Sequence, residues 1–175
     1  MTFRRAFLFG AGFGLLLGFI VAAYMVGSNA KARAVGCAAL AGQAQLQCVT
    51  RETNSQIVAT DDFTHYGVND VWVESPADGK GDCEDYVLTK ARKLEALGWS
   101  VGRMSMAVFR YGGKTHAVLV IDGADVLDSM SPWVGRWADY HGKPEASYPI
   151  AFARSLARLK SLPKSAPEVV LASGR

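Results

Sequence analysis

The clearest fold signal in this sequence is a predicted helix followed by three short predicted strands. Residues 83–97 carry acidic side chains in the first turn and apolar ones at helical spacing, and Gly98 ends the pattern. Three apolar runs follow, at residues 103–111, 115–121 and 124–129. Gly-Gly and Asp-Gly pairs, which are typical of hairpin turns, separate these runs. The sequence therefore predicts an α+β fold in which a helix accompanies a small antiparallel sheet.

The other segments carry weaker signals. Residues 36–66 contain few helix breakers and scattered apolar positions, which predicts one or two helices. The run at 115–121 is apolar on both faces, so we expect it at the centre of the sheet. We also expect an irregular aromatic segment near residues 133–148, a last helix at 149–162 and a loose, flexible tail at 163–175.

The N-terminus differs from everything that follows. Arg4 and Arg5 precede about twenty apolar residues without a charge. This pattern is typical of a secretory signal peptide or of an uncleaved signal-anchor that crosses the membrane once; a buried soluble helix is the alternative. The positive-inside rule places the two arginines in the cytoplasm and the domain outside it. We therefore expect residues 1–34 to export a domain formed by residues 36–162.

The charge balance excludes one class of partner. The formal net charge is +3, and lysine and arginine are dispersed among acids rather than clustered. Surfaces that bind nucleic acid need clustered basic side chains, so we expect no nucleic-acid partner.

Half of the residues are apolar, which is enough for most of the chain to fold around a core.

The chain has three cysteines, and export changes their interpretation. Cys37 and Cys48 lie close together in the sequence, and in an oxidising compartment such a pair can close a disulfide. Cys83 then remains as a free thiol. The alternative is that all three cysteines are reduced and structural.

Cys83 lies among three acids, Asp82, Glu84 and Asp85, in the stretch "GKGDCEDY". Their negative charge raises a thiol pKa and suppresses the nucleophilic thiolate. The start of the predicted helix has the opposite effect, because its partial positive charge lowers the pKa. Cys83 is therefore either a nucleophile at a helix N-terminus or a small buried side chain beside acids that favour the helix dipole.

His116 and Asp128 are the best partners for such a nucleophile. His116 opens a predicted strand beside the helix, and a catalytic base in turn needs an orienting acid. A three-residue loop at residues 121–123 would pair Val120 with Ala124. His116 would then lie directly opposite Asp128 on one face of the sheet, whereas a two-residue loop would separate them. The structural alternatives are a histidine that only packs and an aspartate that caps a turn.

The sequence resembles the bacterial transglutaminase-like cysteine peptidases in three stretches: "YGVNDVW", "GDCEDYVLTKARKLEALGW" and "HAVLVIDGADVLDS". The resemblance covers roughly residues 49–133, and the best-known members are the LapG-type periplasmic proteases, which cut large surface adhesins. It implies a papain/transglutaminase-like fold, with the nucleophile at the N-terminus of a central helix packed on a small antiparallel sheet. It also implies that Cys83 is the nucleophile, His116 the base and Asp128 the orienting acid.

The resemblance further implies a calcium ion beside the nucleophile. Its ligands would be Asp82 and Glu84, with Asp85 as a further candidate. Carboxylate oxygens are ligands that calcium prefers, and the bound charge would offset the acids that suppress the Cys83 thiolate. The backbone N–H of Cys83 would contribute to an oxyanion hole, for which the second donor is open.

These features together predict a calcium-dependent cysteine protease of the periplasm that cleaves a protein substrate, with a surface adhesin as the family's example. Trp72 and Gln56 are the candidates for the second oxyanion donor. The implied partners are the substrate, an inner-membrane receptor that senses a cytoplasmic nucleotide and, if residues 6–26 stay in place as an anchor, the membrane. Two other functions remain open: transglutaminase- or amidase-type acyl transfer on cell-wall peptides, and a membrane-anchored binding domain with a silent triad.

Overall fold

The computed structural model describes residues 36–161, except residue 112 and residues 141–142. The expected signal or anchor at residues 1–34 and the expected tail at residues 163–175 lie outside this described part. Within it, no helix is both long enough and apolar enough to cross a membrane.

The chain divides into a first unit, residues 1–39, and a second unit, residues 40–175. Of the first unit the structure describes residues 36–39, where Cys37–Ala39 forms a turn of 3-10 helix. The Ala39 N–H closes this turn by donating to the Gly36 carbonyl at 3.0 Å. All elements described below belong to the second unit.

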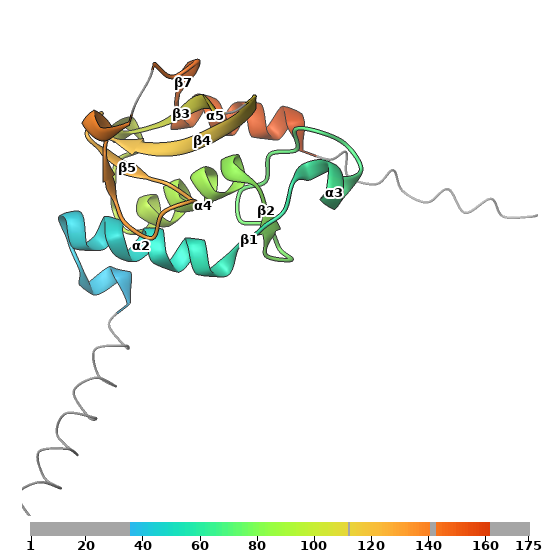
Figure 1. Cartoon of the computed structure of the whole chain (residues 1–175). Helices are drawn as coiled ribbons and strands as arrows, with labels where there is room; N and C mark the ends of the chain where they lie inside the picture. The colour runs from blue at the N-terminus through green and yellow to red at the C-terminus, as the bar shows by residue number, and fades with distance from the viewer. Residues whose placement is uncertain (1–35, 112, 141–142, 162–175) are drawn as a thin grey trace, which may run out of the picture. The chain divides into compact units, whose positions relative to one another are not determined.

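A five-stranded antiparallel sheet forms one layer of the second unit (Figure 1). Its spatial order is β6-β5-β4-β3-β7. The strands are β3 (Met104–Tyr111), β4 (Lys114–Ile121), β5 (Asp125–Leu127), β6 (Gly135–Arg136) and β7 (Ala146–Pro149). Residues 117–121 of β4 are buried, which agrees with the central position expected from its two apolar faces. β6 and β7 were missed, because strands of two and four residues carry too little alternation to be recognised.

Helix α4 (Cys83–Ala96) lies between the sheet and α2 (Gly42–Gln56) (Figure 1). It contacts β4 on one side and α2 on the other, and residues 84–91 are therefore all buried. The last helix, α5 (Ile150–Lys160), contacts β3, β7 and α4. This arrangement confirms the predicted α+β fold, in which a central helix packs on a small antiparallel sheet.

Three short elements lead into α4. β1 (Val58–Ala59) pairs in parallel with β2 (Lys80–Gly81), and α3 (Asp62–Tyr66) lies in the segment between them. Both α3 and α4 contact β2. Gly81 permits this close approach, because a Cβ at this position would lie 2.4 Å from Oδ2 of Asp85. The pairing therefore brings α3 close to the start of α4.

Candidate active site

Cys83 is the first residue of α4, and it is partly exposed. Its Sγ–H donates to Oε2 of Glu84 at 3.1 Å. Burial raises the pKa of the Cys83 thiol far above its usual range, and the negative charge of Glu84 raises it further. A hydrogen bond from the backbone N–H of Ala117, on β4, opposes this rise. With only these groups around it, Cys83 therefore rests as a thiol.

His116, on β4, and Asp128, just after β5, form a close pair in which Nε2 lies 2.8 Å from Oδ1. The two side chains are 12% and 11% exposed, so solvent screens their interaction only weakly. The structure thus brings His116 and Asp128, the two predicted partners of Cys83, into contact with each other. His116 also lines the cavity that contains Cys83.

The register between β4 and β5 differs from the predicted one by two residues. Ile121 pairs with Asp125, so the loop consists of residues 122–124 and not 121–123. The loop lies one residue further along the chain than predicted, because Asp122 and Gly123 are its first two residues and adopt positive φ values of 53° and 66°. A shift by two residues keeps each side chain on its predicted face. The histidine therefore reaches the aspartate diagonally rather than directly across the hairpin.

Asp128 is held at both carboxylate oxygens. Oδ1 also accepts the Met130 N–H at 2.9 Å, and Oδ2 accepts the Tyr140 hydroxyl at 2.6 Å. Burial alone would raise the pKa of Asp128, but hydrogen bonds from His116, Tyr140 and the Met130 N–H lower it to about 2. Asp128 is therefore ionised and fixed. Tyr140 lies in the segment expected to be an irregular aromatic cover, and no sequence pattern indicated this contact.

Helix α2 holds the loop that begins at Asp128, which we call the 128–134 loop. Asn54 Nδ2 lies within hydrogen-bond distance of three of its carbonyls, those of Asp128 (2.9 Å), Ser129 (3.2 Å) and Ser131 (2.9 Å). Gln47 and Arg51 lie on the same face of α2 and contact the loop further along, at Val134 (3.1 Å) and over the Trp133 ring (4.4 Å). α2 therefore fixes the backbone that carries Asp128.

Four carboxylates gather beside the thiol, and we call them the acid cluster: Asp62, Asp82, Glu84 and Asp85. One oxygen from each of Asp62, Asp82 and Asp85 lies within 4.8 Å of the other two. Each of these three acids also has a buried oxygen without a hydrogen-bond partner among the described residues. Burial, reinforced by Glu84, raises the pKa of Asp82 to about 9. Burial also raises the pKa of Asp85 to about 7, against a hydrogen bond from the Val73 N–H.

The acid cluster fits a hard cation. Buried carboxylate oxygens without partners are costly, and a cation that takes oxygen ligands would satisfy them. All three acids predicted from the sequence belong to the cluster. Asp62 was missed, because it comes from α3 and no local spacing links it to the stretch around Cys83.

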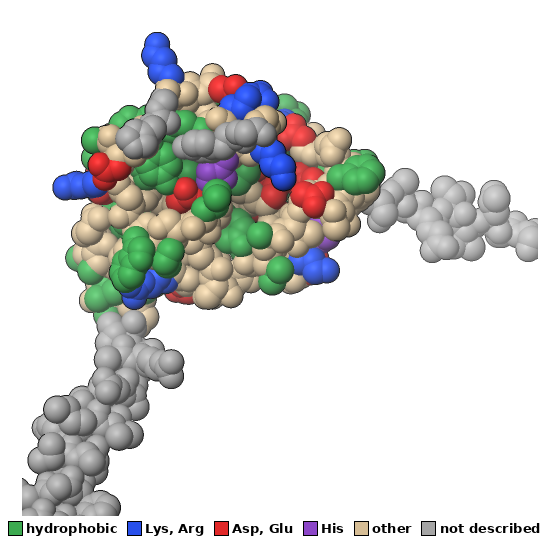
Figure 2. Space-filling model, in the orientation of Figure 1, with side chains coloured by type: hydrophobic (Ala, Val, Ile, Leu, Met, Phe, Trp, Pro, Cys, Tyr) green, Lys and Arg blue, Asp and Glu red, His purple; other side chains and the backbone are tan. Residues whose placement is uncertain are grey.

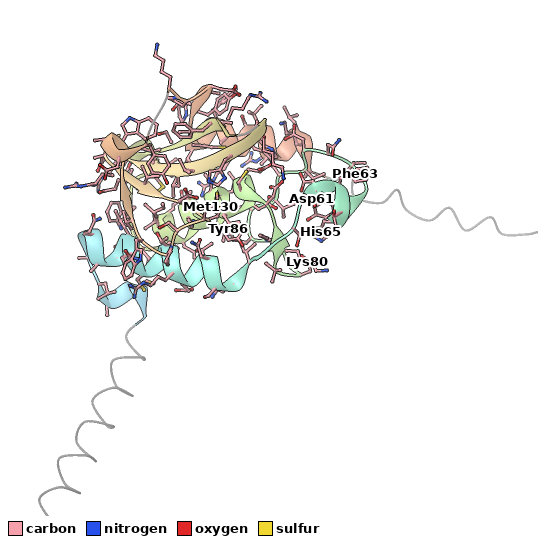
Figure 3. All side chains as sticks on the ribbon, viewed as in Figure 1. Asp61, Phe63, His65, Lys80, Tyr86 and Met130 are labelled. Atoms are coloured by element: carbon pink, nitrogen blue, oxygen red, sulfur yellow. The ribbon has the colours of Figure 1, made fainter. Side chains whose placement is uncertain are left out.

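Two cavities meet at His116. The first has a volume of about 730 Å³, and we call it the Cys83 cavity; Cys83, Asp61 and Phe63 are among its lining residues. The second has a volume of about 770 Å³, and we call it the Tyr140 cavity; its lining includes Asp128, Met130 and Tyr140. His116 and Thr115 line both cavities. Figure 3 shows Phe63, on α3, apart from Met130, in the 128–134 loop.

Neither candidate for the second oxyanion donor lines the Cys83 cavity. Nε1 of Trp72 donates to Oδ1 of Asp70 at 2.7 Å. The side-chain amide of Gln56 is engaged with Glu52 and Lys93. The backbone N–H of Cys83 itself lies in the first turn of α4, where N–H groups have no acceptor within the helix.

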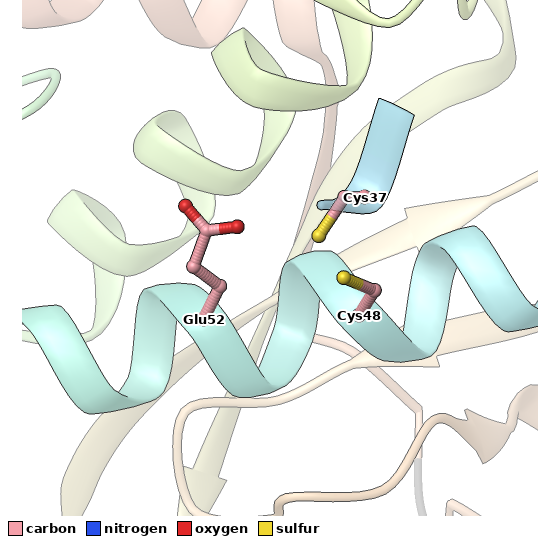
Figure 4. A group of neighbouring side chains, drawn as sticks. All are labelled: Cys37, Cys48 and Glu52. Carbon is pink, nitrogen blue, oxygen red and sulfur yellow. The ribbon is translucent and has the colours of Figure 1, made fainter. Parts of the chain in front are cut away.

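Cys37 and Cys48 are both disulfide-bonded, whereas Cys83 is free. The alternative in which all three cysteines are reduced is therefore wrong. Sulfur atoms in a disulfide are not the thiolates that metals bind. Glu52, one turn along α2 from Cys48 (Figure 4), pairs instead with Lys93 at 2.9 Å.

Residues 27–143 match the bacterial transglutaminase-like cysteine proteinases (BTLCP), and this span includes Cys83, His116 and Asp128. The chain belongs to this family. The match covers more than half of the sequence, and it confirms the family recognised from three short stretches. No curated protein matches the sequence of this family member.

Three solved structures of LapG from Legionella pneumophila are similar to this BTLCP chain. EGTA-treated LapG is 25% identical with a TM-score of 0.50, and the match covers 59% of this chain and 61% of that one. Another LapG structure is 24% identical with a TM-score of 0.47, covering 59% and 65%. Calcium-bound LapG is 20% identical with a TM-score of 0.49, covering 64% and 79%. The chain thus spans less than two thirds of the first two LapG chains, and the first match supports the transglutaminase-like fold.

Proposed function

We propose that this BTLCP member hydrolyses a peptide bond of a protein substrate by acyl transfer through Cys83, His116 and Asp128. The observation that carries the proposal is the His116–Asp128 pair, with Nε2 2.8 Å from Oδ1, at the wall of the cavity that contains the Cys83 thiol. Nucleophilic catalysis needs a base that is fixed by a carboxylate and lies beside a thiol. Membership of a cysteine proteinase family supports the same reaction.

The proposed reaction gives each of the three side chains a task. Because Nε2 of His116 is engaged by Asp128, Nδ1 is the nitrogen that exchanges protons. The Cys83 thiol gives its proton to His116, and the sulfur forms a bond to the substrate carbonyl carbon. The developing oxyanion accepts the backbone N–H of Cys83 at the start of α4.

The second half of the reaction returns the protein to its starting state. The C–N bond breaks, and His116 gives its proton to the leaving amine. A water molecule then loses a proton to His116 and attacks the thioester carbon, which breaks the S–C bond. The carboxylic acid departs, and the sulfur of Cys83 takes the proton back. Asp128 keeps the imidazole in one orientation throughout.

We further propose that the acid cluster holds calcium. The ligands would be oxygens of Asp62, Asp82 and Asp85, with Glu84 next to the thiol; the support is their mutual approach and their unpartnered buried oxygens. When bound, the cation supplies the positive charge that lowers the pKa of the neighbouring thiol. The chain's own contribution is to hold four carboxylates close to Cys83.

We propose the periplasm as the place of action. The disulfide-bonded state of Cys37 and Cys48 supports an oxidising compartment, and the basic and then apolar N-terminus supports export. Anchoring by residues 6–26 rests on the uncharged apolar stretch that follows Arg4 and Arg5. Control by an inner-membrane receptor and an adhesin substrate rest on the family resemblance alone.

The test uses purified full-length protein, calcium and a library of proteome-derived peptides whose amines are blocked. Mass spectrometry follows the new amino termini that cleavage creates. We expect new termini with the wild type, and none with Cys83→Ser or His116→Ala. In a parallel reaction that contains a small primary amine, products joined to that amine would instead indicate acyl transfer. Equal termini in wild type and Cys83→Ser, or none in either, would contradict the proposal.

A further inference from the structure

We propose that the Tyr140 cavity binds the substrate residues on the C-terminal side of the scissile bond and selects an apolar side chain there, with Met130 as the specificity-determining residue. This inference rests on the proposed protease function and names the substrate preference of the same site. Its support is the set of residues that line each cavity, the half of the substrate that leaves as the amine, and the exposure of Met130.

The reaction gives the two cavities different roles. The acyl carbon becomes bonded to Sγ of Cys83, and Cys83 lines only the first cavity. The leaving nitrogen receives its proton from His116, whose side chain lines both cavities. The chain that departs as the amine therefore lies on the far side of His116 from Cys83. That side is the Tyr140 cavity.

The two cavities also differ in chemistry. Five acids line the Cys83 cavity: Asp61, Asp62, Asp70, Asp82 and Glu84. In the Tyr140 cavity, Met130 and the Tyr140 ring supply apolar surface. Its charged lining residues are Lys114, Asp139 and Asp128, and the Asp128 carboxylate is already engaged by His116 and Tyr140. On the face in Figure 2, acidic side chains gather toward the right, while apolar side chains lie next to the histidine. A cavity of about 770 Å³ with apolar walls suits one or two apolar substrate side chains.

Met130 is held in a position to contact the substrate. Its side chain is 79% exposed, which leaves a large apolar group for a substrate to bury. Its backbone is fixed, because its N–H donates to Asp128 and Asn54 holds the carbonyls of the residues on either side. An exposed apolar side chain on a fixed backbone binds without the entropy loss of ordering a loop.

The experiment compares two matched variants with the peptide library described above. Met130→Lys places a positive charge in the Tyr140 cavity, and Phe63→Lys places one in the Cys83 cavity. Both side chains are exposed, at 79% and 64%, so both variants are expected to fold. The rate at which iodoacetamide alkylates Cys83 checks that the catalytic thiol is intact, because this small reagent reacts with the thiol without a peptide side chain bound in either cavity.

We expect the wild type to favour Leu, Met, Ile or Phe at the first or second position after the scissile bond. Met130→Lys should lower that preference about tenfold and favour acidic residues at the same position, a size typical of one changed pocket contact. Phe63→Lys should change only positions before the scissile bond. The inference is wrong if Met130→Lys cleaves with unchanged preference after the bond or alters positions before it. Failure of the wild type to cleave any peptide would instead overturn the proposed function, and this inference with it.

Discussion

His116 reaches Asp128 diagonally across the β4–β5 hairpin, and the 2.8 Å contact uses only one of the two carboxylate oxygens. The other oxygen accepts the Tyr140 hydroxyl at 2.6 Å. The Asp128 carboxylate is thus fixed from two sides, by His116 on β4 and by a residue of the segment after β6. A fixed carboxylate keeps the imidazole in one tautomer and one orientation.

Removal of the Tyr140 hydroxyl should slow catalysis without unfolding the protein. Tyr140→Phe deletes one hydrogen bond to an ionised group, so we expect kcat to fall about tenfold, equivalent to about 1.4 kcal/mol. Steady-state kinetics on one cleaved peptide measures the change. Tyr148→Phe is the control, and an equal loss in both variants would argue against a specific role for Tyr140.

Tyr140→Phe should also change how the free energy of unfolding falls at low pH. The pKa of Asp128 is lowered to about 2 in the fold, so its stabilising contribution is present above its ordinary value and is lost as pH falls through about 2. Without the Tyr140 hydroxyl the folded pKa rises, and the loss begins at higher pH. Acid unfolding followed by circular dichroism should show a higher midpoint pH for Tyr140→Phe; an unchanged midpoint would contradict this account.

Asn54 should matter for both stability and catalysis. Asn54→Ala removes the side-chain amide that contacts three part-buried carbonyls of the 128–134 loop, and a typical hydrogen bond contributes about 0.5–1.5 kcal/mol to stability. We expect a lower free energy of unfolding and a reduced kcat in the protein that remains folded. Ser55→Ala, one residue further along α2, is the control. Full activity of folded Asn54→Ala would show that the loop keeps its shape without α2.

The buried Lys90 side chain should lower the free energy of unfolding of the wild-type protein. Its side chain is fully buried in α4, and its Nζ has no hydrogen-bond partner among the described residues. Burial lowers the pKa of Lys90 to about 7, against the attraction of Asp128. A buried charge without a hydrogen-bond partner carries a desolvation cost. Lys90→Met removes the charge and keeps an unbranched side chain, so this variant should unfold at higher denaturant concentration than the wild type.

The advantage of Lys90→Met should depend on pH. Below about pH 7 lysine is charged in both the folded and the unfolded state, and the full burial penalty applies. Between that pH and the ordinary lysine pKa only the unfolded state binds the proton, so wild-type stability rises with pH. Urea midpoints measured across this range should therefore converge for the two proteins. A gap that is constant or widens with pH would contradict the assignment.

Asp62 tests the acid cluster directly. Asp62→Asn removes one charged ligand, and we expect calcium affinity, measured by titration calorimetry, to fall at least about tenfold. The rise in Tm produced by calcium over chelator should shrink accordingly. Asp61→Asn, the neighbouring exposed residue, is the control. Calcium binding that is equal in both variants would show that Asp62 lies outside the site.

Much of the site follows from local sequence. The helix that starts at Cys83 is marked by its acidic first turn, and the strand that starts at His116 by its doubly apolar run. The sequence left a two-residue and a three-residue hairpin loop open, and only a three-residue loop places His116 and Asp128 on one face. The loop in the structure, residues 122–124, has that length. The three acids around the thiol are visible as neighbours in the sequence.

The remaining parts depend on contacts between distant segments. Asp62 joins the acid cluster through the β1–β2 pairing, and Asn54 meets the 128–134 loop only after α2 packs on α4. Tyr140 comes from a segment without periodicity. Lys90 was unpredictable for another reason, because a lysine on a helix is normally expected to reach solvent.

The most direct test of the central claim is the alkylation rate of Cys83 at pH 7 in full-length protein with calcium. Cys37 and Cys48 are disulfide-bonded, so Cys83 is the thiol that reacts. If His116 and Asp128 activate this thiol, the wild type should react with iodoacetamide at least about tenfold faster than His116→Ala, with Asp128→Asn between them. Equal rates in all three proteins would contradict the triad and leave Cys83 as an ordinary thiol.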